Sequence, residues 1–188
     1  IHDFYSKIYG EGRTIIVMQV GSFHECYGTD TKGLNLINIA QSLDIVCTRK
    51  NTKEEVSIKN PRMLGFPTSV TDTFIEKLCN LNFTVILIDQ TSEPPKPKRE
   101  VTGIYSPSTY IDAKSLITVK TNFLVSIIID KKSSISNQLC IGICSYDLST
   151  GYGSFYETYS KENDLMLALD DTNRYLETCP PREVILQT

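Results

Sequence analysis

Residues 14–28 read TIIVMQVGSFHECYG, and this stretch decides how the N-terminal half of the chain folds. Its first seven residues are largely β-branched and apolar, and the run stops at Gly21. This pattern predicts a buried strand that ends in a turn, because β-branched side chains favour strands and glycine adopts turn conformations easily. The residues that directly follow the strand, Phe23, His24 and Glu25, are therefore well placed to act on a ligand.

Hydrophobic spacing outward from this stretch assigns the other elements. Apolar residues three to four positions apart predict helices, and short apolar runs bounded by turn residues predict strands. We expect helices within 31–43, 70–81 and 162–176, and strands at 45–48, 83–88, 123–129, 139–149, 154–158 and 183–186. The three strands between 123 and 158 should form an antiparallel meander. The sequence therefore predicts an α/β fold with two small domains.

A proline-rich segment marks the expected boundary between these domains. Residues 93–98 read EPPKPK, and proline interrupts both helices and strands. We therefore predict an N-terminal domain with a mixed sheet over residues 1–98 and a second domain over residues 99–188. A chain of 188 residues has room for two compact units of this size.

Charge and cysteine content limit the functional classes. The formal net charge of −3 excludes nucleic-acid binding through bulk positive charge alone, because nonspecific affinity comes from neutralised phosphates. Any DNA contact must be local, and the polar loop 49–60 (RKNTKEEVSIKN) is locally basic. The six cysteines include no C-x-x-C pair and both histidines lie near the N-terminus, so we expect no metal or other cofactor in this chain.

The same features indicate where the protein resides. No apolar run approaches the roughly 20 residues that span a bilayer, so we expect no membrane partner. The chain starts at Ile1 without a secretory signal, which predicts a non-secreted part of a longer protein. Free thiols without disulfide spacing favour a reducing intracellular compartment.

The segment VGSFHECYG at 20–28 resembles V-G-D-F-Y-E-L-F-G, the strand-to-helix turn of the MutS family of DNA mismatch repair proteins. Further landmarks follow in the family's order: LDI at 43–45 and TR at 48–49 (L-D-I-x-L-T-x-R), MLGFP at 63–67 (M-A-G-V-P), IDQ at 88–90 (I-x-E-Q), REV at 99–101 (R-x-V), SPST at 106–109 (T-P-G-T) and YDLSTG at 146–151 (D-L-S-T-G). Together they cover nearly the whole chain, so the resemblance is much more specific than any single short motif.

The resemblance implies a mismatch-binding domain followed by a connector domain with a fold like ribonuclease H. Its implied partners are double-stranded DNA with mismatches or small loops and, for the full-length protein, a MutS-like dimer partner. The full-length family member would be an ATPase that uses ATP and magnesium. This chain contains no G-x-x-x-x-G-K-[ST] motif, so we expect no enzymatic activity from it alone.

The chain also departs from the family pattern. Ser22, His24 and Cys26 replace the usual Asp, Tyr and Leu, and Gln19 stands where Arg is common. Ser108 replaces a Gly. These differences suggest a divergent branch of the kind carried by large DNA viruses or by some mitochondria.

Phe23 and Glu25 match the Phe-x-Glu pair of the family, which implies a wedge and a base contact. A phenyl ring on a rigid turn can enter the minor groove and separate base steps at a cost of a few kcal/mol, which is lower at a mismatch. A carboxylate near a polyanion is repelled unless a base donates a specific hydrogen bond to it. Without the resemblance, Phe23 would be read as a core residue and Glu25 as a solvated residue near a helix start.

The remaining DNA-binding candidates are His24 and four basic residues. For His24 we expect packing between strand and turn, with a contact at the groove edge as the DNA-binding alternative. Arg49, Lys50, Lys53 and Arg62 are predicted to contact phosphates beside the wedge, since positioning contacts come mostly from Lys and Arg. Simple solvation of a polar loop is the alternative for each of them.

Two other functional classes stay open. A ribonuclease-H-like nuclease would be built on the second half, but metal-dependent cleavage needs several converging carboxylates. Asp147 has no evident partner set, so we expect it to cap the turn at 149–151. A protein-interaction module would use Phe23 as an anchor. Magnesium-dependent cleavage would favour the nuclease, and indifference to DNA would favour the interaction module.

Overall fold

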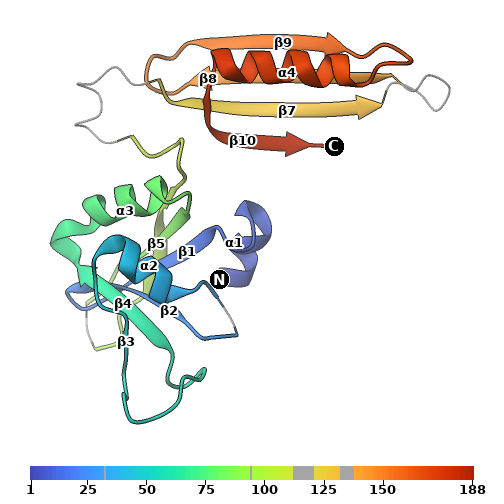
Figure 1. The fold of residues 1–188 in the computed structure, drawn as a ribbon. Helices are drawn as coiled ribbons and strands as arrows, with labels where there is room; N and C mark the ends of the chain where they lie inside the picture. The colour runs from blue at the N-terminus through green and yellow to red at the C-terminus, as the bar shows by residue number, and fades with distance from the viewer. Residues whose placement is uncertain (32, 94, 112–120, 132–137) are drawn as a thin grey trace. The chain divides into compact units, whose positions relative to one another are not determined.

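The chain forms two compact units, residues 1–110 and residues 111–188 (Figure 1). The computed structural model describes residues 1–31, 33–93, 95–111, 121–131 and 138–188. Each unit has its own mixed sheet and its own apolar core. The predicted α/β class with two sheets is therefore confirmed.

The first unit is built on a six-stranded sheet with the order β3-β4-β2-β1-β5-β6. Its elements are α1 (His2–Tyr9), β1 (Thr14–Val20), β2 (Phe23–Gly28), α2 (Leu36–Leu43), β3 (Thr48–Arg49), β4 (Arg62–Pro67), the 3₁₀ turn Thr68–Val70, α3 (Thr71–Asn80), β5 (Thr84–Gln90) and β6 (Arg99–Tyr105). Strands β1 and β5 run parallel, and every other neighbouring pair is antiparallel. The sheet is mixed, as predicted.

Helices α2 and α3 cover one face of this sheet and enclose the core with it. Alternate residues of the strands point into that core, among them Val17 and Leu64, which are fully buried. The rings of Phe66 and Phe74 stack with their centroids 4.2 Å apart. Asn35 caps α2, because its side-chain oxygen accepts hydrogen bonds from two backbone N–H groups of the first turn.

The hairpin after β1 differs from the predicted strand-to-helix turn. Gly21 adopts φ 61°, and the chain returns at once as the antiparallel strand β2 instead of entering a helix. The predicted helix at 31–43 begins only at Leu36. Strand β4 and helix α1 were not predicted as elements, since β4 contains a proline and a glycine and α1 is short and mostly polar.

The predicted domain boundary at residue 98 is wrong. Residues Arg99–Tyr105 form β6, which pairs with β5 in the first sheet. The proline-rich segment is the connection of a hairpin, and the backbone N–H of Thr91 donates to the carbonyl of Lys98 at 2.9 Å. Proline fits a hairpin connection as well as a linker between domains, because neither segment needs the backbone hydrogen bonds of a sheet. The first unit therefore extends to Tyr110.

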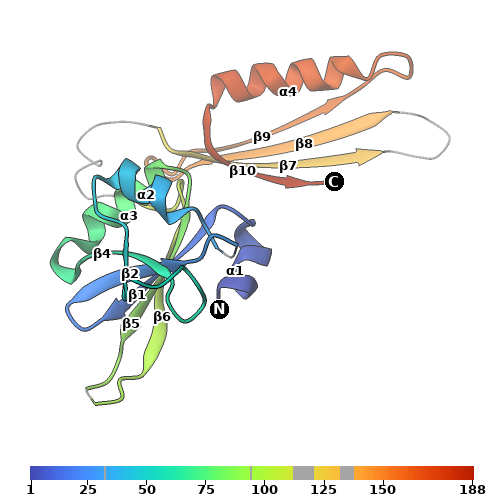
Figure 2. The ribbon, with the colours of Figure 1, turned by 60° about the horizontal axis from the view of Figure 1, so that its bottom comes forward.

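The second unit has the strand order β10-β7-β8-β9. Its elements are β7 (Phe123–Lys131), β8 (Leu139–Asp147), β9 (Gly153–Tyr159), α4 (Met166–Thr178) and β10 (Pro181–Gln187). The first three strands form the predicted antiparallel meander, and β10 pairs parallel with β7. Helix α4 lies over one face of this sheet (Figure 2). The likeness to ribonuclease H stays a prediction.

Asp147 caps a turn, as the sequence predicts. Its side chain accepts hydrogen bonds from the backbone N–H groups of Ser149 at 3.0 Å and Asn122 at 2.8 Å, and from the hydroxyl of Thr150 at 2.7 Å. Burial by itself would raise the pKa of Asp147, but these hydrogen bonds outweigh it and lower the pKa. The carboxylate is therefore committed to the local fold.

Candidate nucleic-acid interface

Phe23 lies at the first position of β2, directly after the tight turn. It pairs with Val20 of β1 on one side and with Pro67 of β4 on the other. The backbone N–H of Thr68 also donates to the carbonyl of Ser22 at 3.0 Å. The ring is nevertheless 45% exposed. The backbone of Phe23 is thus held from both sides while its side chain stays accessible.

Strand β2 divides its side chains between two faces. His24 and Cys26 are buried against the helical side, while Phe23, Glu25 and Tyr27 alternate with them and share the opposite face. An aromatic ring and a carboxylate two residues apart can therefore approach the same ligand. This agrees with the pairing of Phe23 with Glu25 that the sequence predicts.

Tyr27 is a member of this surface that the sequence analysis missed. Its hydroxyl donates a hydrogen bond to a carboxylate oxygen of Glu25. Partial burial, followed by this hydrogen bond and the adjacent negative charge, raises the pKa of Tyr27 to about 12. Side chains alternate along a strand with a period of two, and this alternation could have placed Tyr27 on the face of Phe23 and Glu25. Glu25 is therefore already oriented by a protein donor.

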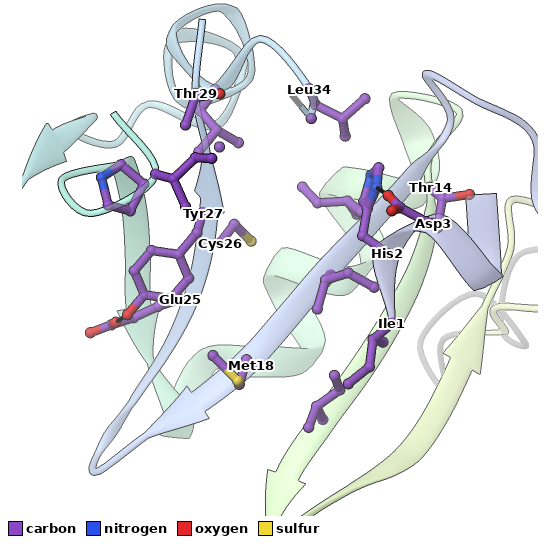
Figure 3. Close-up of a pocket in the computed structure, with 18 residues that line it drawn as sticks. Ile1, His2, Asp3, Thr14, Met18, Glu25, Cys26, Tyr27, Thr29 and Leu34 are labelled. Carbon is purple, nitrogen blue, oxygen red and sulfur yellow. Dashed lines mark hydrogen bonds and ion pairs between the residues drawn. The ribbon is translucent and has the colours of Figure 1, made fainter. Parts of the chain in front are cut away.

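The wall beside Glu25 is apolar. Met18 lies opposite Glu25 on β1, and Gly65 lies opposite it on β4. A side chain at Gly65 would approach the Cγ atom of Glu25 to 3.2 Å, so the glycine makes room for the carboxylate. Figure 3 shows Glu25, Tyr27 and Met18 around a pocket of about 470 Å³ that extends toward α1.

Gln19 fastens the base of the hairpin to the neighbouring strands. Its side-chain oxygen accepts from the backbone N–H of Gln90 at 2.9 Å, and its amide nitrogen donates to the carbonyl of Gly21 at 3.0 Å. The guanidinium of Arg99 donates to the backbone carbonyl of Gln19 at 3.1 Å. Arg99 is exposed, so it brings a positive charge to the strands next to the turn. Arg99 was not among the phosphate contacts predicted from the sequence.

His24 does not reach the exposed face. It is only 4% exposed, and its ring nitrogens lie 2.7 Å from the hydroxyl of Thr71 and 2.8 Å from a carboxylate oxygen of Asp89. The predicted contact of His24 at a groove edge is therefore wrong. Strand alternation places this side chain inside, so the packing role that we expected for it applies.

The predicted basic residues fall into two groups. Arg49 and Arg62 are partners across β3 and β4, and Arg62 forms an ion pair with Asp30 at 2.8 Å. The hydrogen bond from this guanidinium lowers the pKa of Asp30. Lys50 and Lys53 are exposed on the adjoining loop. The structure thus brings these cations to one end of the sheet.

That end is not the one that carries Phe23. Arg62 pairs with Gly28, the last residue of β2, whereas Phe23 is the first. At about 3.4 Å per residue the two positions lie roughly 17 Å apart. The structure therefore does not place Arg62 next to Phe23, and the contacts of these cations with phosphates stay a prediction.

Buried Asn60 gives the basic loop a defined shape. Its amide nitrogen donates to the backbone carbonyls of Asn51 at 2.9 Å and Glu55 at 3.2 Å, and its oxygen accepts from the N–H of Asn51 at 3.0 Å. Arg49 donates to the carbonyl of Thr52 at 2.8 Å. The loop is polar as predicted, but it is organised around a buried amide.

The first unit thus defines a class of protein: mixed α/β domains that present an aromatic ring and a carboxylate from one hairpin. A family model described as MutS domain I matches residues 1–114. The chain belongs to the MutS family of DNA mismatch repair proteins. The predicted membership is confirmed.

Three relatives show how far the similarity extends. The putative DNA mismatch repair protein mutS homolog L359 of Acanthamoeba polyphaga mimivirus is 31% identical over 97% of this chain and 16% of its own length. The MutS proteins of Clostridium novyi and Staphylococcus epidermidis are 28% and 27% identical over 92% and 97% of this chain. They are covered over 17% and 19% of their own lengths, so the chain spans less than a fifth of these relatives. A viral relative is consistent with the predicted divergent branch.

No helix among the described residues is long and apolar enough to cross a membrane.

Proposed function

We propose that this chain recognises mismatched bases or small loops in double-stranded DNA, with Phe23 as the wedge and Glu25 as the base contact. The observation that carries the proposal is their shared exposed face at the end of a hairpin that is fixed on both sides. The family relationship supplies the substrate class, since the relatives are named DNA mismatch repair proteins.

Discrimination would come from the cost of opening the base stack. Separating a base step costs a few kcal/mol, and less at a mismatch because part of the pairing energy is already lost. Stacking of a base on Phe23 returns roughly 1–3 kcal/mol on either duplex. Because the return is similar and the cost differs, the mismatched duplex is favoured. A fixed hairpin raises the affinity for both duplexes, since little ordering is needed on binding.

Glu25 would add specificity by repelling paired DNA. Its charge opposes the phosphates unless a displaced base donates a hydrogen bond to the carboxylate. In the structure one carboxylate oxygen of Glu25 already accepts a hydrogen bond from the hydroxyl of Tyr27. A carboxylate has room for further donors, so Tyr27 can hold Glu25 in place while a base binds the remaining positions.

The basic residues would set affinity without reading sequence. Arg49, Lys50, Lys53 and Arg62 are proposed to contact phosphates at the far end of β2 from the wedge. Arg99 would contact phosphates next to the hairpin, because its guanidinium already lies at Gln19. His24 has no part in this contact surface.

The partners and cofactors of a longer protein are also proposals. By its family, the full-length protein would act with a MutS-like dimer partner and would use ATP and magnesium. The present chain would be the noncatalytic DNA-reading part. Since it spans less than a fifth of its relatives, we expect the isolated chain to be mostly monomeric and to bind DNA weakly. No observation in the described residues favours the nuclease alternative, since the side chain of Asp147 is committed to its turn.

The test is a nuclear magnetic resonance titration of the ¹⁵N-labelled chain with two duplexes that differ by one mismatch. We expect amide shift changes centred on Phe23, Glu25 and Tyr27 that are larger for the mismatched duplex. Changes at the basic residues should appear with both duplexes and weaken with salt. Equal changes for both duplexes at the hairpin would overturn the proposal.

A further inference from the structure

His24 is the one side chain between Phe23 and Glu25, and it points to the opposite side of the sheet. One of its ring nitrogens, Nδ1, lies 2.7 Å from the hydroxyl of Thr71 at the start of α3. The other, Nε2, lies 2.8 Å from a carboxylate oxygen of Asp89 on β5. The imidazole therefore connects β2, the strand that carries Phe23 and Glu25, to α3 and to β5.

The connection continues beyond Asp89. The second carboxylate oxygen of Asp89 accepts a hydrogen bond from the hydroxyl of Thr102 on β6. The hydroxyl of Thr71 also lies 2.8 Å from the carbonyl of Thr68, in the turn that joins β4 to α3. A chain of hydrogen bonds thus runs from β6 through β5 and β2 to the start of α3. It passes directly behind the proposed contact residues.

Every polar atom of the imidazole has a partner in this arrangement. If Nε2–H donates to Asp89, then Nδ1 accepts from the Thr71 hydroxyl. If both nitrogens carry protons, the Thr71 hydroxyl accepts from Nδ1–H and donates to the Thr68 carbonyl instead. A buried polar group with full hydrogen bonding fixes its surroundings, whereas losing a partner leaves a costly unsatisfied atom.

The anchoring is directional, which apolar packing is not. The ring of Phe66 lies next to His24 with centroids 6.1 Å apart, so this position also has an apolar neighbour. An apolar ring could fill the same space, but it could not specify where β2 sits along β5. The tyrosine of the MutS pattern offers one hydroxyl oxygen where His24 offers two ring nitrogens at separate points.

We propose that His24 is a positioning residue for mismatch recognition: its hydrogen bonds to Asp89 and Thr71 hold β2 so that Phe23 and Glu25 meet DNA in one fixed geometry. This inference rests on the proposed function for its consequence in DNA binding. The positioning itself concerns only the free protein. Errors of about an ångström in a contact group are enough to reduce its effect strongly.

Three substitutions separate the two hydrogen bonds. His24→Gln places an amide nitrogen near the position of Nε2 and keeps the donor to Asp89. His24→Asn places its amide near Nδ1 and keeps a contact with Thr71 only. His24→Phe keeps the ring and removes both. Ile75→Val, in the buried core of α3, serves as a control for general loss of stability.

The first measurement is made without DNA. Amide hydrogen exchange at residues 23–25 should accelerate in His24→Phe and His24→Asn more than in Ile75→Val, after correction for the global stability of each variant. His24→Gln, which keeps one of the two bonds, should exchange at a rate between those of wild type and His24→Phe. If exchange in the His24 variants merely follows global stability, His24 is an ordinary core residue and the positioning role is overturned, whatever the protein does with DNA.

The second measurement is the ratio of affinities for the mismatched and matched duplexes. We expect this ratio to fall toward one in His24→Phe and His24→Asn, to fall less in His24→Gln, and to persist in Ile75→Val. A ratio that persists in all His24 variants, with altered exchange, would show that recognition does not need this geometry and would overturn the inference. If the wild-type chain itself shows no preference, the proposed function fails, and the exchange data still decide whether His24 positions the strand.

Discussion

Each unit exposes a phenylalanine on a strand, but the two surroundings differ. Phe23 of the first unit is 45% exposed and stands at a tight turn, with its backbone paired on both sides and Glu25 on the same face. Phe155 of the second unit is 85% exposed and lies opposite Cys144 on the edge strand β9. The larger exposed fraction of Phe155 does not by itself make its surroundings a binding site.

What distinguishes the hairpin is how firmly its backbone is anchored to the rest of the unit. Gln19, Arg99 and Tyr27 hold its base and its carboxylate, and His24 connects it to the interior. Around Phe155 the sheet face that is turned away from α4 carries other exposed apolar side chains, such as Ile128 and Tyr146. Glu157 follows Phe155 on this face and is hydrogen-bonded by Tyr159 and Cys140, much as Glu25 is by Tyr27. The two regions differ in the backbone instead, because β9 is an edge strand paired only with β8, whereas β2 is paired on both sides.

Phe23→Ala is expected to have the largest effect. Removing the ring should abolish the preference for a mismatched duplex and leave weak, salt-dependent binding, because the phosphate contacts remain. The loss of stacking, roughly 1–3 kcal/mol, corresponds to a factor of about 5 to 150 in affinity for the mismatched duplex. Affinities for both duplexes, measured by fluorescence anisotropy at low salt, provide the test.

Phe155→Ala is the matched control for that substitution. It removes a more exposed ring from the other sheet and should leave both affinities unchanged. If Phe155→Ala reduced the preference as much as Phe23→Ala does, the distinction between the two regions would be lost. Retained preference in Phe23→Ala would remove the wedge assignment.

Asp147→Ala should destabilise the second unit without changing DNA preference. The substitution removes the acceptor of the buried N–H of Asn122, which costs about 1–3 kcal/mol, whereas the exposed N–H of Ser149 can bond to water instead. Thermal unfolding and amide exchange along β8 should report the loss. An equal loss of protection in β2 of the first unit would contradict this prediction.

The same residue gives that stability a pH dependence. Hydrogen bonds lower the pKa of Asp147 in the folded protein, so the stabilisation is present above the ordinary value of 3.8 and is lost as the pH falls through the lowered folded value. Asp147→Asn removes the titration. The stability difference between wild type and Asp147→Asn should therefore shrink in this acidic range, and a constant difference would exclude Asp147 as its source.

Much of this fold could be predicted from the sequence, because most helices and strands are specified by patterns within their own short segments. The run at 14–20 and the meander of the second unit follow from apolar periodicity, and the turn after Asp147 follows from its own side-chain chemistry. Strand β6 was not predicted, because it becomes a strand only by pairing with β5 in the folded sheet. A proline-rich segment carries no sign of whether the chain returns to the same sheet.

The candidate site was predictable only in part for the same reason. Phe23 and Glu25 could be named from a motif, but the burial of His24 depends on which face of β2 meets the helices. The distance of Arg62 from Phe23 depends on the register between β2 and β4, which no local pattern specifies. The remaining features of the site depend on contacts between residues far apart in the chain, such as that of His24 with Asp89.

Glu25→Gln should change the ratio of affinities rather than abolish it. The substitution keeps the shape and an acceptor oxygen but removes the charge that repels phosphates. Affinity for paired DNA should therefore rise more than affinity for mismatched DNA. The ratio of the affinity for mismatched DNA to that for paired DNA should be smaller than in wild type at both low and high salt, because a base contact is screened less than an exposed charge. If both affinities rose by the same factor and only at low salt, Glu25 would be a solvated surface residue.

Arg62→Gln should have the smallest effect, and the second unit again offers the comparison. Arg62 and Arg174 each form a surface ion pair with an aspartate, at 2.8 Å with Asp30 and at 3.3 Å with Asp171. Surface pairs of this kind contribute little to stability, so neither substitution should change the unfolding temperature much. If Arg62 contacts a phosphate, Arg62→Gln should weaken binding to both duplexes equally and reduce the slope of log affinity against log salt by about one. Arg174→Gln removes the same charge from the other unit and should leave that slope unchanged. Identical slopes for the two variants would mean that Arg62 acts only through net charge, and the phosphate contact would then have to be sought at Arg99, Lys50 or Lys53.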